Sequence, residues 1–173
     1  MTATQKKSWT KGIGIILFLG VFAAIIWQIV GAKTAAPPLT FQTLTQKQLS
    51  LPDLKGKVVL VNFWATSCPG CIKEMPELVK LYQSYQAQKK PVELIAVAMQ
   101  YDSEQYVRHY QQANQLPFPV VLDQKGDIAH QFGDIKLTPT LVMIDPHGNI
   151  IQQYLGEVNP ATLREKIDQL IQS

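Results

Sequence analysis

The chain has 173 residues and an apolar fraction of 46%, which is enough for one ordinary domain with a buried core plus an appendage. Its formal net charge of +3 comes from one end, because residues 1–33 hold four lysines and no acid, which leaves 12 basic and 13 acidic residues elsewhere. No basic face for nucleic acid is therefore predicted. The presence of only two cysteines argues against a secreted fold held together by several disulfides.

The N-terminal segment has the pattern of a membrane anchor. Residues 1–11 are polar, and residues 12–32 follow with Gln28 as their only strongly polar member. At about 1.5 Å per residue, such a helix covers the roughly 30 Å hydrocarbon core of a bilayer. The lysines before this segment outnumber the single lysine after it. We therefore predict a cytoplasmic tail at 1–11, a transmembrane helix at 12–32 and an outward-facing domain.

A cleaved signal peptide is the alternative for this segment. Val30-Gly31-Ala32 matches a small-residue cleavage site. However, the apolar stretch is longer than the usual signal core of about 7 to 15 residues. Either outcome exports the domain.

The next residues predict a connection to the domain. Residues 33–40 include two adjacent prolines and have no periodic apolar pattern, so we expect an extended, fairly stiff linker with the domain at 41–173. Broken alternation over residues 39–51 predicts one or two short edge strands.

The stretch from Val58 to Cys71 is the most informative part of the sequence. Residues 58–64 are a continuous apolar run rich in β-branched and aromatic side chains, which predicts a central strand covered on both faces. Apolar positions after Cys71 recur at helical spacing and predict a helix over 69–88. Pro69 suits the first turn of this helix, whereas Pro76 inside it must kink the helix or remove a hydrogen bond. Cys68 is therefore expected at a helix start.

The rest of the chain alternates strands and helices. Strands are predicted at 92–99, 118–122, 140–145 and 150–155. Helices are predicted at 102–115, capped by Asp102 or Ser103, at 127–132, and after the start signal Asn159-Pro160. The β-α-β-α-β order predicts parallel pairing of the first three strands, whereas the short turn after residue 145 predicts an antiparallel hairpin.

The two cysteines predict disulfide exchange. Free N–H groups and the positive dipole end of a helix start stabilise an anion. Cysteines in such settings have pKa values of about 3.5 to 7.5, compared with about 8.5 for a free cysteine. Cys68 is therefore the expected nucleophile. Cys71, one turn later, is the expected resolving cysteine, which closes a Cys68–Cys71 bridge.

Other interpretations of the pair fit less well. A zinc site needs a second pair of ligands, but there is no further cysteine, and His109, His130 and His147 are isolated and expected at the surface. A haem attachment signal needs a histidine at position 72, where the chain has Ile72. A structural disulfide closing so short a loop would stabilise the fold only a little. No metal and no cofactor is predicted.

These residues also carry a family resemblance. Phe63-Trp64-Ala65 before the CxxC pair resembles the active site of the thioredoxin superfamily, and Leu137-Thr138-Pro139-Thr140 resembles its cis-proline loop. Residues 54–65 and Glu74-Met75-Pro76 resemble the TlpA, ResA and CcmG-like group of membrane-anchored bacterial thiol-disulfide oxidoreductases. The resemblance covers residues 39–173. It implies a thioredoxin-like α/β fold, a central mixed sheet flanked by helices, with the central insertion of the TlpA-like group at 102–122.

The resemblance implies roles for further residues. Glu74 is expected to handle protons at the resolving cysteine, and its alternative is a solvated glutamate in an early helical turn. Asn62 stands where related enzymes often carry a titrating aspartate, which leaves Glu74 as the better proton carrier. Thr138-Pro139 is expected to form a cis bond whose neighbouring backbone binds a partner strand, the alternative being a trans proline that starts a strand.

Three residues next to the cysteines are expected to support the site. Trp64 is equally compatible with a docking surface and with the core. Pro69 withholds one amide from the thiolate, and Gly70 leaves the turn flexible.

We therefore expect an extracytoplasmic thiol-disulfide oxidoreductase anchored in the bacterial cytoplasmic membrane and facing the periplasm. The resemblance implies that it reduces disulfides of exported proteins, for example in cytochrome c maturation, and that a membrane electron donor re-reduces it. A disulfide-forming oxidant stays open, because Pro69 is typical of related oxidants and reductants alike. A peroxiredoxin-like thiol peroxidase would need threonine at position 65, which is Ala65. A non-catalytic docking module would leave the intact CxxC pair unexplained.

Overall fold

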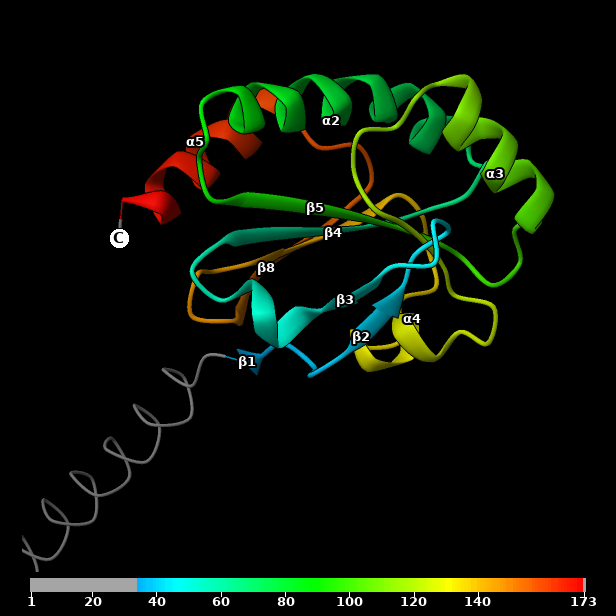
Figure 1. Ribbon diagram of the computed structural model, residues 1–173, viewed down its shortest axis with the longest axis horizontal. Coiled ribbons are helices and arrows are strands. Elements are labelled where there is room, and N and C mark those ends of the chain that lie inside the picture. Colours follow the sequence, from blue (N-terminus) through cyan, green and yellow to red (C-terminus); the bar gives the residue numbers. More distant parts are fainter. Residues whose placement is uncertain (1–33, 173) are drawn as a thin grey trace, which may run out of the picture. The chain divides into compact units, whose positions relative to one another are not determined.

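A six-stranded mixed sheet is the centre of the fold (Figure 1). The computed structural model describes residues 34–172, and in them the strand order is β1-β8-β7-β4-β5-β6. The three parallel strands are β4 (Val58–Trp64), β5 (Val92–Ala98) and β6 (Val120–Leu122). Strand β7 (Thr140–Ile144) pairs antiparallel with β4, and β8 (Asn149–Leu155) pairs antiparallel with β7. The predicted parallel unit and the predicted hairpin are both confirmed.

Strand β4 lies in the middle of this sheet and is buried along its whole length. Because successive side chains of a strand point to opposite faces, β4 contributes to two hydrophobic layers. Val59, Val61 and Phe63 belong to one layer, and Leu60 and Trp64 to the other. The prediction of a central strand covered on both faces is confirmed.

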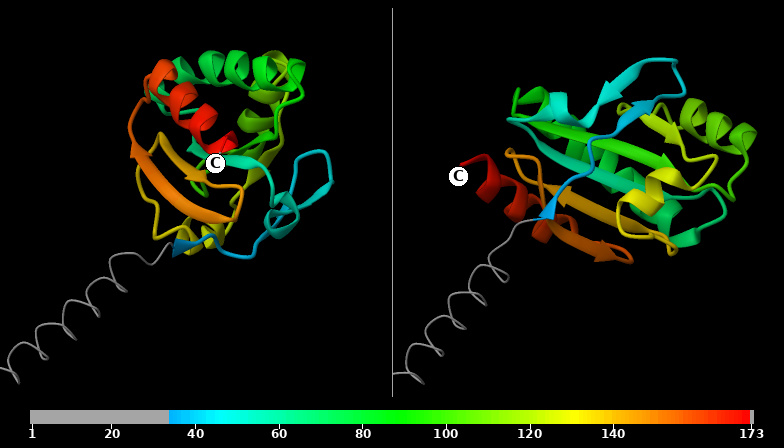
Figure 2. Two further views of the ribbon diagram at one scale, coloured as in Figure 1. Left: turned by 90° about the vertical axis from the view of Figure 1, so that its left-hand side faces the viewer. Right: turned by 90° about the horizontal axis from the view of Figure 1, so that it is seen from below.

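Helices and a hairpin cover the two faces (Figures 1 and 2). One face carries α2 (Pro69–Ala87), α3 (Glu104–Ala113) and α5 (Pro160–Ile171). The other carries the 3-10 helix η1 (Leu51–Leu54), α4 (Asp127–Gln131) and the hairpin of β2 (Thr40–Gln42) and β3 (Gln48–Ser50). All four predicted helices are present, and α2 continues through Pro76.

The two short strands predicted over residues 39–51 are present as β2 and β3. They pair with each other in a separate two-stranded sheet, which the sequence pattern did not indicate. Phe41 of β2 is buried in the layer of η1 and α4, and Thr43 makes an isolated bridge to Val121 of β6. The broken apolar alternation thus arises because only a few side chains of the hairpin reach the core.

The predicted linker also differs from the structure. Thr34 and Ala35 form β1, which pairs antiparallel with β8 through Ile150 and Asn149. Part of the expected spacer therefore belongs to the sheet, because the free edge of β8 offers backbone partners that a local pattern does not reveal. The predicted tail and membrane anchor at 1–32 lie outside the described residues. Within residues 34–172, no helix is long and apolar enough to cross a membrane.

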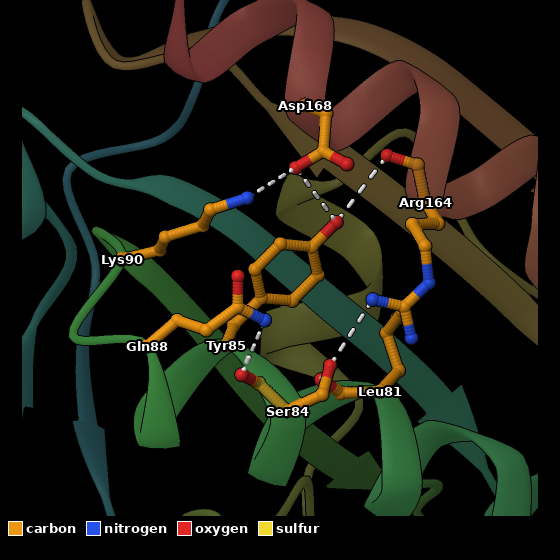
Figure 3. Close-up of polar contacts among 7 residues, drawn as sticks. All are labelled: Leu81, Ser84, Tyr85, Gln88, Lys90, Arg164 and Asp168. Carbon is orange, nitrogen blue, oxygen red and sulfur yellow. Dashed lines mark hydrogen bonds and ion pairs between the residues drawn. The ribbon is translucent and has the colours of Figure 1, made fainter.

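Tyr85 fastens the C-terminal half of α2 to α5 (Figure 3). Its side chain is fully buried, and its hydroxyl donates to the Asp168 carboxylate and to the Arg164 carbonyl oxygen, both at 3.3 Å. Lys90 pairs with Asp168 at 3.0 Å, and the cations of Lys90 and Arg164 each lie 5.4 Å from the ring centroid. Burial, followed by the Asp168 charge, raises the pKa of Tyr85 to about 12, which keeps the hydroxyl a neutral donor.

We predict that Tyr85→Phe lowers the free energy of unfolding by about 1 kcal/mol, because it removes one buried donor. Tyr85→Ala should cost about 3 to 5 kcal/mol, since it also leaves a cavity between α2 and α5. Urea unfolding of the oxidised protein measures both. As a control, Tyr106→Phe at an exposed position should stay within about 0.5 kcal/mol of wild type. A cost below about 1 kcal/mol for Tyr85→Ala would show that this contact does not hold α5.

Candidate active site

The two cysteines lie at the junction of β4 and α2. Cys68 is the N-cap of α2, and its Sγ accepts a hydrogen bond from the backbone N–H of Cys71 at 3.2 Å. A disulfide joins the two residues, whose Cα atoms are 5.3 Å apart. The predicted position of Cys68 at a helix start is confirmed, and the sulfur lies where the helix presents its free N–H groups.

The two cysteines differ in exposure. Cys68 is partly exposed, whereas Cys71 is only 1% exposed. A sulfur atom from a partner can therefore reach Cys68 from solvent but not Cys71. This asymmetry supports the roles predicted for them, with Cys68 as the attacking residue and Cys71 as the resolving residue.

Glu74 is a buried carboxyl group three residues after Cys71 on α2. Its side chain is 6% exposed, so the alternative of a solvated glutamate is wrong. Oε1 accepts the backbone N–H of Val158 at 3.1 Å, whereas Oε2 is buried without a hydrogen-bond partner among the described residues. Burial raises the pKa of Glu74, the Val158 hydrogen bond lowers it, and the charge of Glu157 raises it further, with a net increase.

Two more side chains of the described residues have buried polar atoms without partners. The Oδ1 atom of Asn62 and the Nε1 atom of Trp64 have no hydrogen-bond partner within residues 34–172. Both side chains belong to the α2 face of β4, as the alternation along the strand requires. Asn62 does not titrate, so Glu74 is the buried carboxyl group that the active-site helix itself carries.

The cis-proline loop packs beside the CPGC turn. The Thr138–Pro139 bond is cis, as predicted. A Cβ atom at Gly70 would lie 3.5 Å from Cδ of Pro139 and 3.6 Å from Oε1 of Glu157, so both residues border the turn. The carbonyl of Pro139 accepts the N–H of Gly156 at 2.8 Å. Within residues 34–172, the backbone N–H and C=O of Thr138 make no hydrogen bond.

Asp102 connects the loop before Cys68 to the start of α3. Its carboxylate accepts the backbone N–H and the hydroxyl of Thr66, both at 2.6 Å, and the N–H of Ser103 at 2.9 Å. The hydroxyl groups of the neighbouring Tyr101 and of Thr138 lie 3.1 Å apart. The β5–α3 connection is thus bonded to both loops that flank Cys68. The sequence suggested Asp102 only as a helix cap, since its partner lies 36 residues away.

Exposed apolar side chains surround this end of the sheet. In the part of the chain that the structure describes, the large hydrophobic residues with more than half of their surface exposed are Tyr101, Tyr106, Leu137 and Leu155. Tyr101 contacts Thr138, Leu137 precedes it, and Leu155 pairs with Thr140 at the start of β7. The sequence pattern did not single out this rim, because isolated apolar residues in loops carry no periodic signal.

Trp64 and Pro69 take different places in the site. Trp64 is 0% exposed and packs against Tyr110, with ring centroids 5.2 Å apart. It therefore supports the site through the core and presents no docking surface. Pro69 is exposed at the first position of α2, where its missing N–H costs no helical hydrogen bond.

The three histidines are exposed and form no metal site among the residues that the structure describes. His109, His130 and His147 are exposed, as predicted, and His130 pairs with Asp134 at 2.5 Å. In residues 34–172, no group of three or more His, Cys, Asp or Glu side chains is arranged to hold a metal ion.

The fold and this cysteine pair together define a thiol-disulfide oxidoreductase of the thioredoxin-like class. Comparison with known proteins agrees. The sequence profile of the Redoxin family matches residues 30–171, and the chain belongs to this family.

Individual relatives point to the same activity. The chain is 32% identical over 169 residues to the thioredoxin-like protein YneN of Bacillus subtilis, covering 94% of this chain and 98% of YneN. It is 35% identical over 158 residues to the thiol-disulfide oxidoreductase ResA of Bacillus cereus, covering 91% of this chain and 88% of that ResA.

Solved structures confirm the thioredoxin-like fold. A thiol:disulfide interchange protein of Chlorobium tepidum superimposes with a TM-score of 0.74 at 25% identity, covering 82% of this chain and 98% of that one. StoA of Bacillus subtilis gives a TM-score of 0.64 at 29% identity, with coverage of 75% and 97%.

Loss of the Asp102 carboxylate should slow disulfide exchange. Asp102→Ala leaves the Thr66 N–H unpaired and frees the loop before Cys68, so we expect about tenfold slower reaction of reduced protein with a peptide disulfide. Asp102→Asn keeps one acceptor oxygen, so its reaction rate should lie between those of wild type and Asp102→Ala. Stopped-flow kinetics measures these rates, with exposed Asp53→Ala in η1 as the control. A wild-type rate in Asp102→Ala would contradict the positioning role.

The buried Glu74 should make stability depend on pH. Because its pKa is higher in the folded than in the unfolded protein, the folded state keeps this proton longer, and stability falls as pH rises above about 4.5 towards the folded pKa. Glu74→Gln should flatten this fall. Urea unfolding between pH 4 and 8 measures the slope, and Glu77→Gln, exposed on the same helix, should keep the wild-type slope. Equal slopes for wild type and Glu74→Gln would contradict the assignment.

Proposed function

We propose that this protein reduces disulfides of exported proteins on the outer side of the cytoplasmic membrane, attached there by its N-terminal segment. The anchor rests on the sequence pattern of residues 12–32 and on the lysines before it. Its relatives include several ResA proteins named as thiol-disulfide oxidoreductases. The observation that carries the proposal is the unequal exposure of Cys68 and Cys71 at the helix start.

The geometry supports a two-step exchange. In the reduced protein, the thiolate of Cys68 attacks one sulfur of the partner's disulfide, a mixed disulfide forms, and the other partner sulfur leaves and takes a proton. The thiolate of Cys71 then attacks Sγ of Cys68 and releases the second partner thiol. The partner gains two electrons and two protons, and the protein keeps the Cys68–Cys71 disulfide seen in the structure.

Glu74 is suited to take the proton that Cys71 must lose before the second step. It lies one helical turn from Cys71, and burial raises its pKa above that of an exposed glutamate. A carboxylate in this setting is a stronger base than an exposed glutamate. Its unpaired Oε2 leaves one oxygen available to hold the proton.

The surroundings of Cys68 suit a polypeptide partner. The free backbone groups of Thr138 can pair with an extended segment of the partner, in the manner of an added strand. The exposed Leu137 and Leu155 offer apolar contacts on either side. Exported proteins whose cysteines must be kept reduced, such as apocytochrome c, are the proposed substrates.

The direction of exchange requires a second partner. A reductant outside the cytoplasm works in an oxidising compartment, so the Cys68–Cys71 disulfide must be reduced again after each cycle. We propose a membrane protein that carries electrons across the bilayer as the donor. The proposed direction requires that the reduction potential of the pair be more negative than that of the substrate disulfide.

Trapping tests the proposal. In full-length Cys71→Ser expressed in its own cells, the second step is lost, so mixed disulfides between Cys68 and exported proteins should accumulate. Non-reducing gels and mass spectrometry identify them. They should sediment with membranes, and Cys68 should react in intact cells with a thiol reagent that does not cross membranes.

Cys68→Ser provides the matched control. Its remaining Cys71 is 1% exposed and should trap almost nothing. Equal trapping by both variants, or labelling of Cys68 only after lysis, would overturn the proposal. A potential of the pair above that of the trapped disulfides would reverse the direction to oxidation.

A further inference from the structure

A hollow of about 360 Å³ lies at the loop just before Cys68, and the exchange chemistry does not use it. Its walls come from the loop just before the nucleophile and from one side of helix α3, and its surface is mostly apolar. The lining residues are Thr66, Ser67, Tyr106, His109 and Tyr110. No lysine, arginine, aspartate or glutamate is among them. His109 is the one lining residue that can carry a positive charge, and the mostly apolar surface therefore favours an uncharged group, which loses little hydration on entering.

The two walls are held at a fixed distance from each other. Asp102 at the start of α3 accepts two hydrogen bonds of 2.6 Å from Thr66. Behind the hollow, the rings of Trp64 and Tyr110 lie 5.2 Å apart, and the N–H of Met99 donates to the carbonyl of Trp64 at 3.0 Å. The cavity is thus preformed, and a ligand would not have to order its walls.

The hollow borders the chain segment that leads directly into the nucleophile. Ser67 lines it and is the chain neighbour of Cys68. A larger side chain at position 67 would occupy this space. Tyr106 on the opposite wall is 65% exposed, although a large aromatic ring gains most when it is covered. A side chain of the partner that entered the hollow would cover this ring.

We propose that this hollow is a specificity pocket that binds an apolar side chain, best an aromatic one, next to the cysteine that Cys68 attacks in its substrate. The pocket determines which polypeptide substrates are preferred, namely those with an apolar side chain near the attacked cysteine. It rests on the proposed function, because it requires a polypeptide partner. Binding such a side chain holds the attacked sulfur over Cys68 and raises the rate of the first step. A shallow apolar pocket of this kind discriminates by about tenfold.

Peptide disulfides of matched sequence test the pocket. The substrates are disulfide-linked dimers of a short single-cysteine peptide, so that both sulfurs are equivalent. Phe, Ala or Glu is placed one or two residues before or after the cysteine. With reduced full-length protein, the best Phe peptide should react about tenfold faster than its Ala counterpart, and the Glu peptide more slowly than both.

Variants link this preference to the hollow. Tyr106→Ala removes one wall at an exposed position and should reduce the preference for Phe over Ala to about twofold. Ser67→Trp fills the space from the other wall and should have the same effect. Gln112→Ala, exposed on α3 but outside the hollow, is the matched control and should keep the wild-type ratio.

The outcomes separate the two proposals. Equal rates for Phe and Ala peptides at every position, or an unchanged preference in Tyr106→Ala, would overturn the pocket and leave the reduction of polypeptides standing. Failure to reduce any of the peptides would overturn the proposed function and the pocket with it. Because the measured quantity is a ratio between two substrates, a general loss of active protein in one variant does not change it.

Discussion

The site depends on one junction, where the buried strand β4 ends and α2 begins. Because β4 is covered on both faces, its end cannot shift without exposing apolar side chains, each worth about 1.5 to 3 kcal/mol. Four residues beyond Trp64, Cys68 caps α2 with its own sulfur, which accepts the N–H of Cys71. The N–H of Cys71, one of the free donors at the start of α2, therefore points at the sulfur of Cys68. When the disulfide opens, the negative charge develops on an atom that the helix already solvates.

Polar groups that the core leaves unpaired gather next to this junction. Buried polar atoms normally have partners, because an unpaired one costs about 1 to 3 kcal/mol. In the described part of the chain, the side-chain atoms that break this rule belong to Asn62, Trp64 and Glu74, and all three residues lie within a few positions of the cysteines. A fold optimised only for stability would avoid such a cluster. Two of these residues belong to β4 and Glu74 belongs to α2, which fits a site where a proton must be held away from bulk water.

The sequence predicted the elements that depend on local residue patterns. It did not predict the features that depend on contacts between residues far apart in the chain. The apolar run of β4 and the helical spacing after Cys71 are local signals, and the Asn159 cap is local as well. The burial of Glu74 depends on Val158, 84 residues away, and the position of the Cys68 loop depends on an aspartate 36 residues away from Thr66. Strand β1 exists because β8 offers a free edge. The sequence did not indicate whether Trp64 lies in the core or at the surface, and its packing against Tyr110 shows that it lies in the core.

Burial also fixes the side from which a partner approaches. Since Cys71 is covered, each exchange must pass through Cys68, and the partner must lie on the surface around that residue. The exposed apolar residues and the hollow beside Ser67 lie there, at the Leu155 end of β8. The described chain enters the sheet at the other end of the same strand, where Thr34 pairs with Ile150. Leu155 lies five residue steps along the strand from Ile150, about 17 Å. The fold thus places Thr34 and the surface around Cys68 at opposite ends of one strand.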